Sequence, residues 1–241
     1  MADAATYSTA QQVDVLFSLL PTDNDVLRKG VKITLCALGA HERGSVVVKT
    51  EKDPYAGTET VLIHPRKPDT RIIITSSEEK LIKRNIGTSV YEELCGFADD
   101  PPKLLKEPDG TGDPASLISG VFSLLPACNK GLEMGVMAVL AGLAIDSLTS
   151  GKVNVEVVYM NAPPPFGTAK IKEIIFSDSS KPDVKVALQR QDIRAFRRNI
   201  KAADYRKLKN VAVGSPVSAS PIMESAEGDA LSDPRNRGVS G

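Results

Sequence analysis

The pentapeptide Phe-Ser-Leu-Leu-Pro occurs twice in this chain, at residues 17–21 and again at residues 122–126. The match extends beyond it, because residues 15–40 and 120–145 share eleven identities without a gap. Self-similarity at a constant offset is typical of a repeated structural unit. We therefore expect two similar units within one chain.

Further short segments match at an offset of 114 residues. Lys-Pro-Asp occurs at 67–69 and 181–183, and Arg-Asn-Ile occurs at 84–86 and 198–200. The matches keep the same order in both halves, and the offset grows only where a loop would accept insertions. The sequence thus predicts a tandem internal duplication.

Each unit is expected to have the element order α-α-β-β-β-α, with a small, mainly antiparallel sheet, which makes the fold class α+β. Apolar spacing and capping residues predict a short helix, a second helix and a closing helix. The second helix is expected to begin at a polar cap, which is Asp23 or Asn24 in the first unit and Asn129 in the second. Runs rich in Val and Ile predict three strands between the second and closing helices. The expected helices are 10–20 and 114–125, then the two that follow Asn24 and Asn129, then 77–95 and 190–209; the expected strands are 45–50, 60–64 and 71–75, then 153–160, 170–176 and 184–189. The Lys-Pro-Asp segments are expected to form a turn before the third strand.

These patterns divide the chain into four parts. Residues 1–97 form the first unit and residues 114–210 the second. A polar segment rich in Pro and Gly, 98–113, is expected to act as a linker. Residues 211–241 lack hydrophobic periodicity and are expected to be a disordered tail.

Composition argues against several classes of protein. The 241 residues carry 30 basic and 30 acidic side chains, which argues against a polycation. The absence of Trp and the presence of only eleven Phe and Tyr argue against a protein that reads single-stranded nucleic acid or sugars on aromatic platforms. Three widely spaced cysteines without a C-x-x-C pair predict neither a disulfide framework nor a zinc site, and favour a reduced, cytoplasmic setting. The most apolar stretch, Met134 to Ile145, is shorter than the roughly 20 residues that span a bilayer, so we expect no transmembrane segment.

The residues that usually carry chemistry do not recur in the two units. His41 and His64 are the only histidines, and neither has a histidine at the matching position of the second unit. Neither a phosphate-binding Gly-Lys-Ser/Thr loop nor a Gly-x-Ser-x-Gly elbow is present. The sequence therefore predicts no enzyme, no cofactor and no metal, although an enzyme with a site between the units stays an alternative.

The closing helices differ in charge. Residues 78–94 carry three basic and four acidic side chains, whereas the aligned residues 192–208 carry six basic and two acidic ones. We therefore expect the second closing helix to bind phosphate or lipid headgroups. The candidate ligand-binding residues are Arg190, Arg194, Arg197, Arg198, Lys201, Arg206, Lys207 and Lys209. The alternative is a solvated basic face.

Two further differences predict interfaces. Glu92 and Glu93 align with Arg206 and Lys207, so opposite charges occupy matching places and could join units or molecules. In the second helix, Lys29, Lys32 and Thr34 are replaced by Met134, Met137 and Val139, which makes that helix apolar on every side. Such a helix is buried on every side, and either the other unit or a second protomer should cover it.

The preferred interpretation is a non-enzymatic, self-associating structural or assembly protein with a basic face for anionic membranes or nucleic acid. Viral matrix proteins are similar in organisation, since they combine two similar domains with a cationic surface, and this analogy extends the expected location to a peripheral membrane or a virion. The alternative is a nucleocapsid-like or transport protein that binds nucleic acid through the same cations. The expected partners of the protein are further copies of itself and an anionic membrane or nucleic acid.

Overall fold

The computed structural model describes residues 7–53, 57–97, 114–125, 129–149, 151–160 and 171–214. The predicted linker 98–113 lies outside the described residues. Of the predicted tail, residues 215–241 also lie outside them, whereas residues 211–214 still belong to the last helix.

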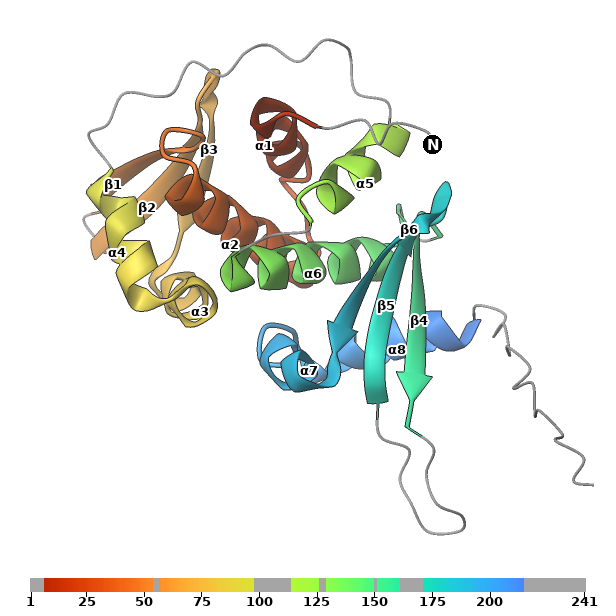
Figure 1. Ribbon diagram of the computed structural model, residues 1–241. Helices are drawn as coiled ribbons and strands as arrows, with labels where there is room; N and C mark the ends of the chain where they lie inside the picture. Colours follow the sequence, from red (N-terminus) through yellow and green to blue (C-terminus); the bar gives the residue numbers. More distant parts are fainter. Residues whose placement is uncertain are drawn as a thin grey trace, which may run out of the picture.

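The same order of elements occurs twice (Figure 1). The first half contains α1 (Thr9–Ser18), α2 (Asp25–His41), β1 (Val47–Asp53), β2 (Gly57–His64), β3 (Lys67–Ile74), α3 (Ser76–Ile86) and α4 (Thr88–Gly96). The second half contains α5 (Pro114–Phe122), α6 (Lys130–Ile145), β4 (Val153–Tyr159), β5 (Ile171–Asp178), β6 (Lys181–Gln189), α7 (Arg190–Phe196) and α8 (Ala202–Gly214). The described chain is therefore a mixed α+β protein with two small antiparallel sheets.

Each sheet is a three-stranded antiparallel meander, with strand orders β1-β2-β3 and β4-β5-β6. The register of the second hairpin shifts between Ile63 and His64 in one sheet and between Ser177 and Asp178 in the other, 114 residues apart. The prediction that Lys-Pro-Asp forms a turn is wrong. The hairpin already closes at residues 65–66, so Lys67 pairs with His64 inside the ladder.

The predicted cap at Asn129 is confirmed, and of the two candidates in the first half, Asp23 and Asn24, Asn24 caps the helix. The side chain of Asn24 accepts hydrogen bonds from the backbone N–H groups of Val26 and Leu27. That of Asn129 accepts equivalent bonds two and three residues further along the chain. Both satisfy donors that would otherwise lack partners in the first turn.

Each predicted closing helix is in fact two helices. In the first half, Gly87 separates α3 from α4 with a φ of 95°, a left-handed conformation that favours glycine. In the second half, residues 197–201 separate α7 from α8. The sequence periodicity misses both breaks because apolar residues continue to face the core on either side of them.

Helices α2 and α6 lie side by side at the centre, between the two sheets (Figure 1). Glycines allow their backbones to approach closely. A Cβ atom added at Gly30 would lie 2.6 Å from the backbone nitrogen of Val139, and one at Gly135 would lie 2.9 Å from that of Thr34. A larger residue at either position would therefore force the helices apart.

The contacts between the halves are reciprocal. Gly30 with Val139 and Thr34 with Gly135 are the same pair exchanged between halves, at the offset of 105. The amides of Asn85 and Asn199, 114 residues apart, donate to each other at 3.0 and 2.7 Å. This pattern, in which equivalent residues meet, is that of an isologous two-fold interface.

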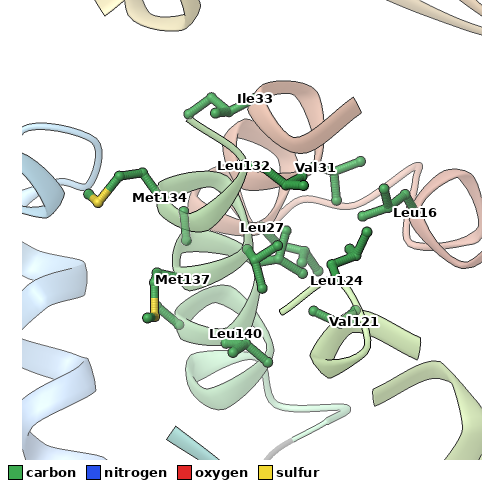
Figure 2. Packing of buried hydrophobic residues seen from close by; sticks show 14 of the residues in the cluster. Leu16, Leu27, Val31, Ile33, Val121, Leu124, Leu132, Met134, Met137 and Leu140 are labelled. Atoms are coloured by element: carbon green, nitrogen blue, oxygen red, sulfur yellow. The ribbon is translucent and has the colours of Figure 1, made fainter. Parts of the chain in front are cut away.

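The apolar helix α6 is covered within the chain. Met137 and Val139 are fully buried, and Met134 is nearly so. Helix α2 packs against one side of α6, and α7 and α8 against another; Figure 2 shows Met134 and Met137 directed toward these C-terminal helices. A second protomer is therefore not needed to bury it. None of the described helices combines the length and apolar composition that crossing a bilayer requires.

A candidate anion-binding groove

Six of the eight basic side chains predicted to bind a ligand line one groove of about 910 Å³ on the second half. Helix α7, the turn after it and helix α8 supply the cations, and the first residue of β5 contributes to the lining. The six are Arg190, Arg194, Arg197, Arg198, Arg206 and Lys209.

Apolar side chains hold these cations in place. Ile193 of α7 and Tyr205 of α8 are buried and line the groove. The guanidinium carbon of Arg197 lies 4.9 Å from the centre of the Tyr205 ring, and the Lys209 ammonium lies 5.6 Å from it. Both distances are within the range of a cation–π interaction, so one ring orients two cations from different segments.

The groove cations lack carboxylate partners in the described part of the chain. Of the two acidic residues on α7 and α8, Asp192 pairs with Lys130 at 2.9 Å and Asp204 with Lys207 at 3.7 Å. Burial opposes the charged form of Lys130, but Asp192 and Glu133 outweigh it and raise the pKa of that ammonium. The two carboxylates are thus engaged elsewhere, and no carboxylate of the described residues compensates the charge in the groove.

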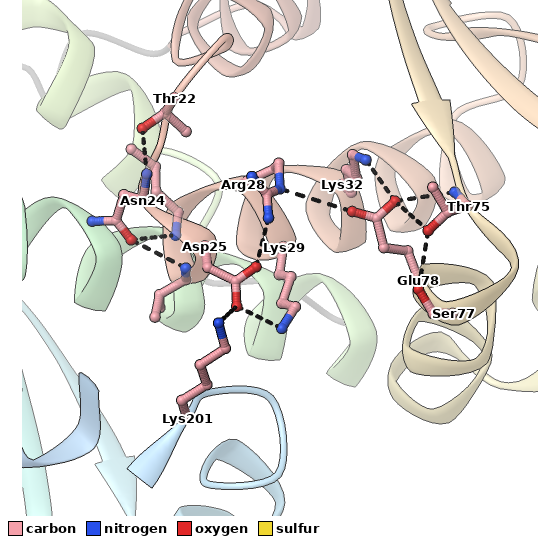
Figure 3. A network of polar contacts seen from close by, with 12 residues as sticks. Thr22, Asn24, Asp25, Arg28, Lys29, Lys32, Thr75, Ser77, Glu78 and Lys201 are labelled. Atoms are coloured by element: carbon pink, nitrogen blue, oxygen red, sulfur yellow. Dashed lines mark hydrogen bonds and ion pairs between the residues drawn. The ribbon is translucent and has the colours of Figure 1, made fainter. Parts of the chain in front are cut away.

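The structure does not place Lys201 and Lys207 in the groove lining. The Lys201 ammonium lies 3.3 Å from Oδ2 of Asp25, which also accepts a hydrogen bond from Lys29 at 2.8 Å (Figure 3). Burial raises the pKa of the Asp25 carboxyl, but Lys29 and Lys201 outweigh it and leave that pKa below its usual value. Lys201 therefore links the two halves, while Lys207 lies beside Asp204.

The proposed pairing of Glu92 and Glu93 with Arg206 and Lys207 is not formed within the described chain. All four side chains are exposed, and no ion pair joins them there. Helices α4 and α8 lie on opposite sides of the molecule (Figure 1). Pairing between separate molecules stays a prediction.

The equivalent place in the first half is neutralised. The Lys83 ammonium lies 5.2 Å from the centre of the Tyr91 ring, a position like that of Arg197 over the Tyr205 ring. Lys83, however, donates to Glu79 at 2.7 Å, and this hydrogen bond raises the pKa of Lys83. In the second half, the matching residues of Glu79 and Glu92 are Ile193 and Arg206.

Sequence reasoning missed the role of the tyrosine. The available signal was the match of Tyr91 with Tyr205, together with Lys209, which follows Tyr205 by four residues and so lies on the same face of the helix. It could not show that the cation eight residues earlier stacks on the ring, because a helix break lies between them.

The one buried histidine has no free ring nitrogen. Nε2 of His64 lies 2.7 Å from Oδ1 of Asp14, and Nδ1 accepts the backbone N–H of Arg66 at 3.1 Å. In the second half, Ser119 and Asp178 take the places of Asp14 and His64 and also link a helix to a strand, because Ser119 donates to Asp178 at 3.0 Å. Within the described residues, no group of His, Cys, Asp and Glu side chains is arranged to hold a metal ion.

Comparison with protein-family models, with curated proteins and with solved structures finds no match for this chain.

Proposed function

We propose that this chain is a non-catalytic binding protein whose groove between α7 and α8 holds phosphate groups of an anionic ligand. The observation that carries the proposal is the set of six cations around one groove that have no carboxylate partner among the described residues. Like charges gathered in one place raise each other's energy, and a bound polyanion relieves this repulsion. Five of the six are arginines, whose planar forks match phosphate oxygens in pairs.

We further propose that the chain arose by tandem duplication and that only the second half gained this role. Reciprocal contacts between the halves and equal element orders support a common origin. The cation over the retained tyrosine is neutralised by Glu79 in the first half and left without a carboxylate in the second. The basic groove is therefore not a requirement of the fold.

Self-association, the other part of the sequence-based interpretation, stays a prediction. Its main support was the helix that is apolar on every side. That helix is covered inside one chain, so it gives no argument for a second protomer.

The test is binding of inorganic polyphosphate, measured by calorimetry at two salt concentrations. The triple variant Arg194→Gln/Arg198→Gln/Arg206→Gln should bind at least about tenfold more weakly and show a shallower salt dependence, because fewer counterions are released. The control Lys49→Gln/Lys80→Gln/Lys152→Gln removes three exposed cations outside the groove lining and should bind like the wild type. Equal loss in both variants would contradict the proposal.

A further inference from the structure

The groove has an exposed apolar rim beside its cations. Tyr159 and Met160, at and just after the end of β4, are 43% and 40% exposed, although large apolar side chains are usually covered. Nη1 of Arg190 lies 3.3 Å from the sulfur of Met160, which joins this rim to the groove lining. Tyr159 pairs across the sheet with Ile171, which lines the groove, so the rim adjoins the groove.

In the first half, charged residues take the matching strand positions. Its first strand ends at Glu51, Lys52 and Asp53, where the second half has Val158, Tyr159 and Met160. Within the residues that the structure describes, the groove cations without carboxylate partners and the exposed Tyr159 ring therefore occur in the same half. A shared ligand accounts for this combination.

We propose, on the basis of the proposed function, that the ligand is single-stranded nucleic acid, with phosphates in the groove and a base stacked on Tyr159. A basic channel that follows the backbone, combined with an aromatic ring for a base, is the usual design for binding single strands. An exposed tyrosine next to arginines also stacks on any of the four bases, so the expected binding depends little on sequence.

The shape of the site favours a strand over a duplex or a bilayer. In a duplex the bases are stacked inside, so only its phosphates could engage the site and Tyr159 would have no partner. A bilayer presents headgroups but no planar base that could stack on Tyr159. A flexible single strand can enter the hollow and offer an unpaired base at the rim.

The experiment measures fluorescence anisotropy with four probes on the full chain. The probes are a labelled 12-nucleotide poly(U) RNA, a 12-base-pair RNA duplex, inorganic polyphosphate as competitor, and vesicles of phosphatidylserine and phosphatidylcholine scored by co-sedimentation. Tyr159→Ala should weaken poly(U) binding about tenfold and leave the affinity for polyphosphate, obtained from the competition, unchanged. Tyr159→Phe keeps the ring and should bind poly(U) like the wild type. Leu148→Ala, which removes an apolar side chain that is 88% exposed and outside the groove lining, is the control.

Each outcome decides between the two proposals. Duplex binding as tight as single-strand binding, or no effect of Tyr159→Ala on poly(U), would overturn the single-strand proposal and leave phosphate binding intact. Binding of vesicles but not poly(U) would replace nucleic acid with a membrane. If the wild type binds none of the four probes, the proposed function itself fails.

Discussion

At the scale of single residues, one buried position carries a charged side chain in the first half and an apolar side chain in the second. Lys32 of α2 is largely buried and donates to Glu78 at 2.7 Å (Figure 3). It also donates to the backbone oxygen of Ile73 at 2.6 Å. The matching residue of the second half is Met137, which needs no partner. A buried cation is tolerated only when it is paired, so Lys32 and Glu78 depend on each other.

Replacing Lys32 with the residue of the other half should therefore destabilise the protein. Lys32→Met leaves Glu78 without its closest cation and is expected to lower the free energy of unfolding by about 3 kcal/mol. Urea denaturation measures this change. The double variant Lys32→Met/Glu78→Gln should recover part of the loss, and a double variant less stable than the single one would refute the coupling.

The His64 site predicts a pH dependence of stability. Burial lowers the pKa of His64 below its ordinary 6.5, and the charges of Lys67 and Arg66 lower it further, whereas Asp14 opposes these effects without overcoming them. The unfolded chain then takes up the proton more readily, so stability is complete above pH 6.5 and falls as the pH drops through the folded-state pKa. His64→Gln should flatten the stability profile between pH 6.5 and 5 in thermal denaturation. An unchanged slope in that window would show that His64 does not cause it.

At the scale of elements, the close approach of α2 and α6 determines how the halves fit. The approach depends on glycine at the crossing points, since added Cβ atoms would meet backbone rather than flexible side chains. Side chains from both helices then form one continuous hydrophobic core (Figure 2).

Gly30→Ala should disturb this crossing. The new methyl group would lie 2.6 Å from the Val139 nitrogen, so the helices must separate, and we expect the free energy of unfolding to fall by about 3 kcal/mol. Gly96→Ala is the matched control, because no atom lies within 4 Å of its added Cβ. Similar melting temperatures for Gly30→Ala and the wild type would show that the helices do not need this contact.

Much of the element pattern could be predicted from the sequence, because local rules decide it. Asn24 and Asn129 cap helices through their own side chains, and alternating Val and Ile face the core from the strands. The breaks in the closing helices could not be predicted in the same way. One depends on the conformation of Gly87, and the other accompanies the contact of Asn199 with Asn85 across the halves.

The basic residues of the candidate site could be predicted from the sequence, but their arrangement in space could not. Eight cations were identified from sequence, yet only the fold shows that Lys201 reaches Asp25 and that Lys207 lies beside Asp204. Tyr159 was not singled out, since one tyrosine at a strand end has no pattern. The role proposed for Tyr159 depends on the groove that the fold places beside it.

At the scale of the whole molecule, one core spans both halves, so neither half should be stable alone. If the chain is divided into 1–97 and 114–241, each piece exposes the apolar face of α2 or α6. We expect the two pieces to aggregate separately and to form a 1:1 complex when co-expressed, which light scattering after size exclusion would detect. Two separately folded, monomeric pieces would refute the shared core.

The central claim is that phosphate binds the second half at a place where the first half has an equivalent but neutralised surface. Hydrogen–deuterium exchange with and without saturating inorganic polyphosphate compares the two places within one molecule. We expect slower exchange in peptides covering 190–209 and unchanged exchange in those covering 76–95. Equal protection of both segments, or protection of 76–95 alone, would contradict it.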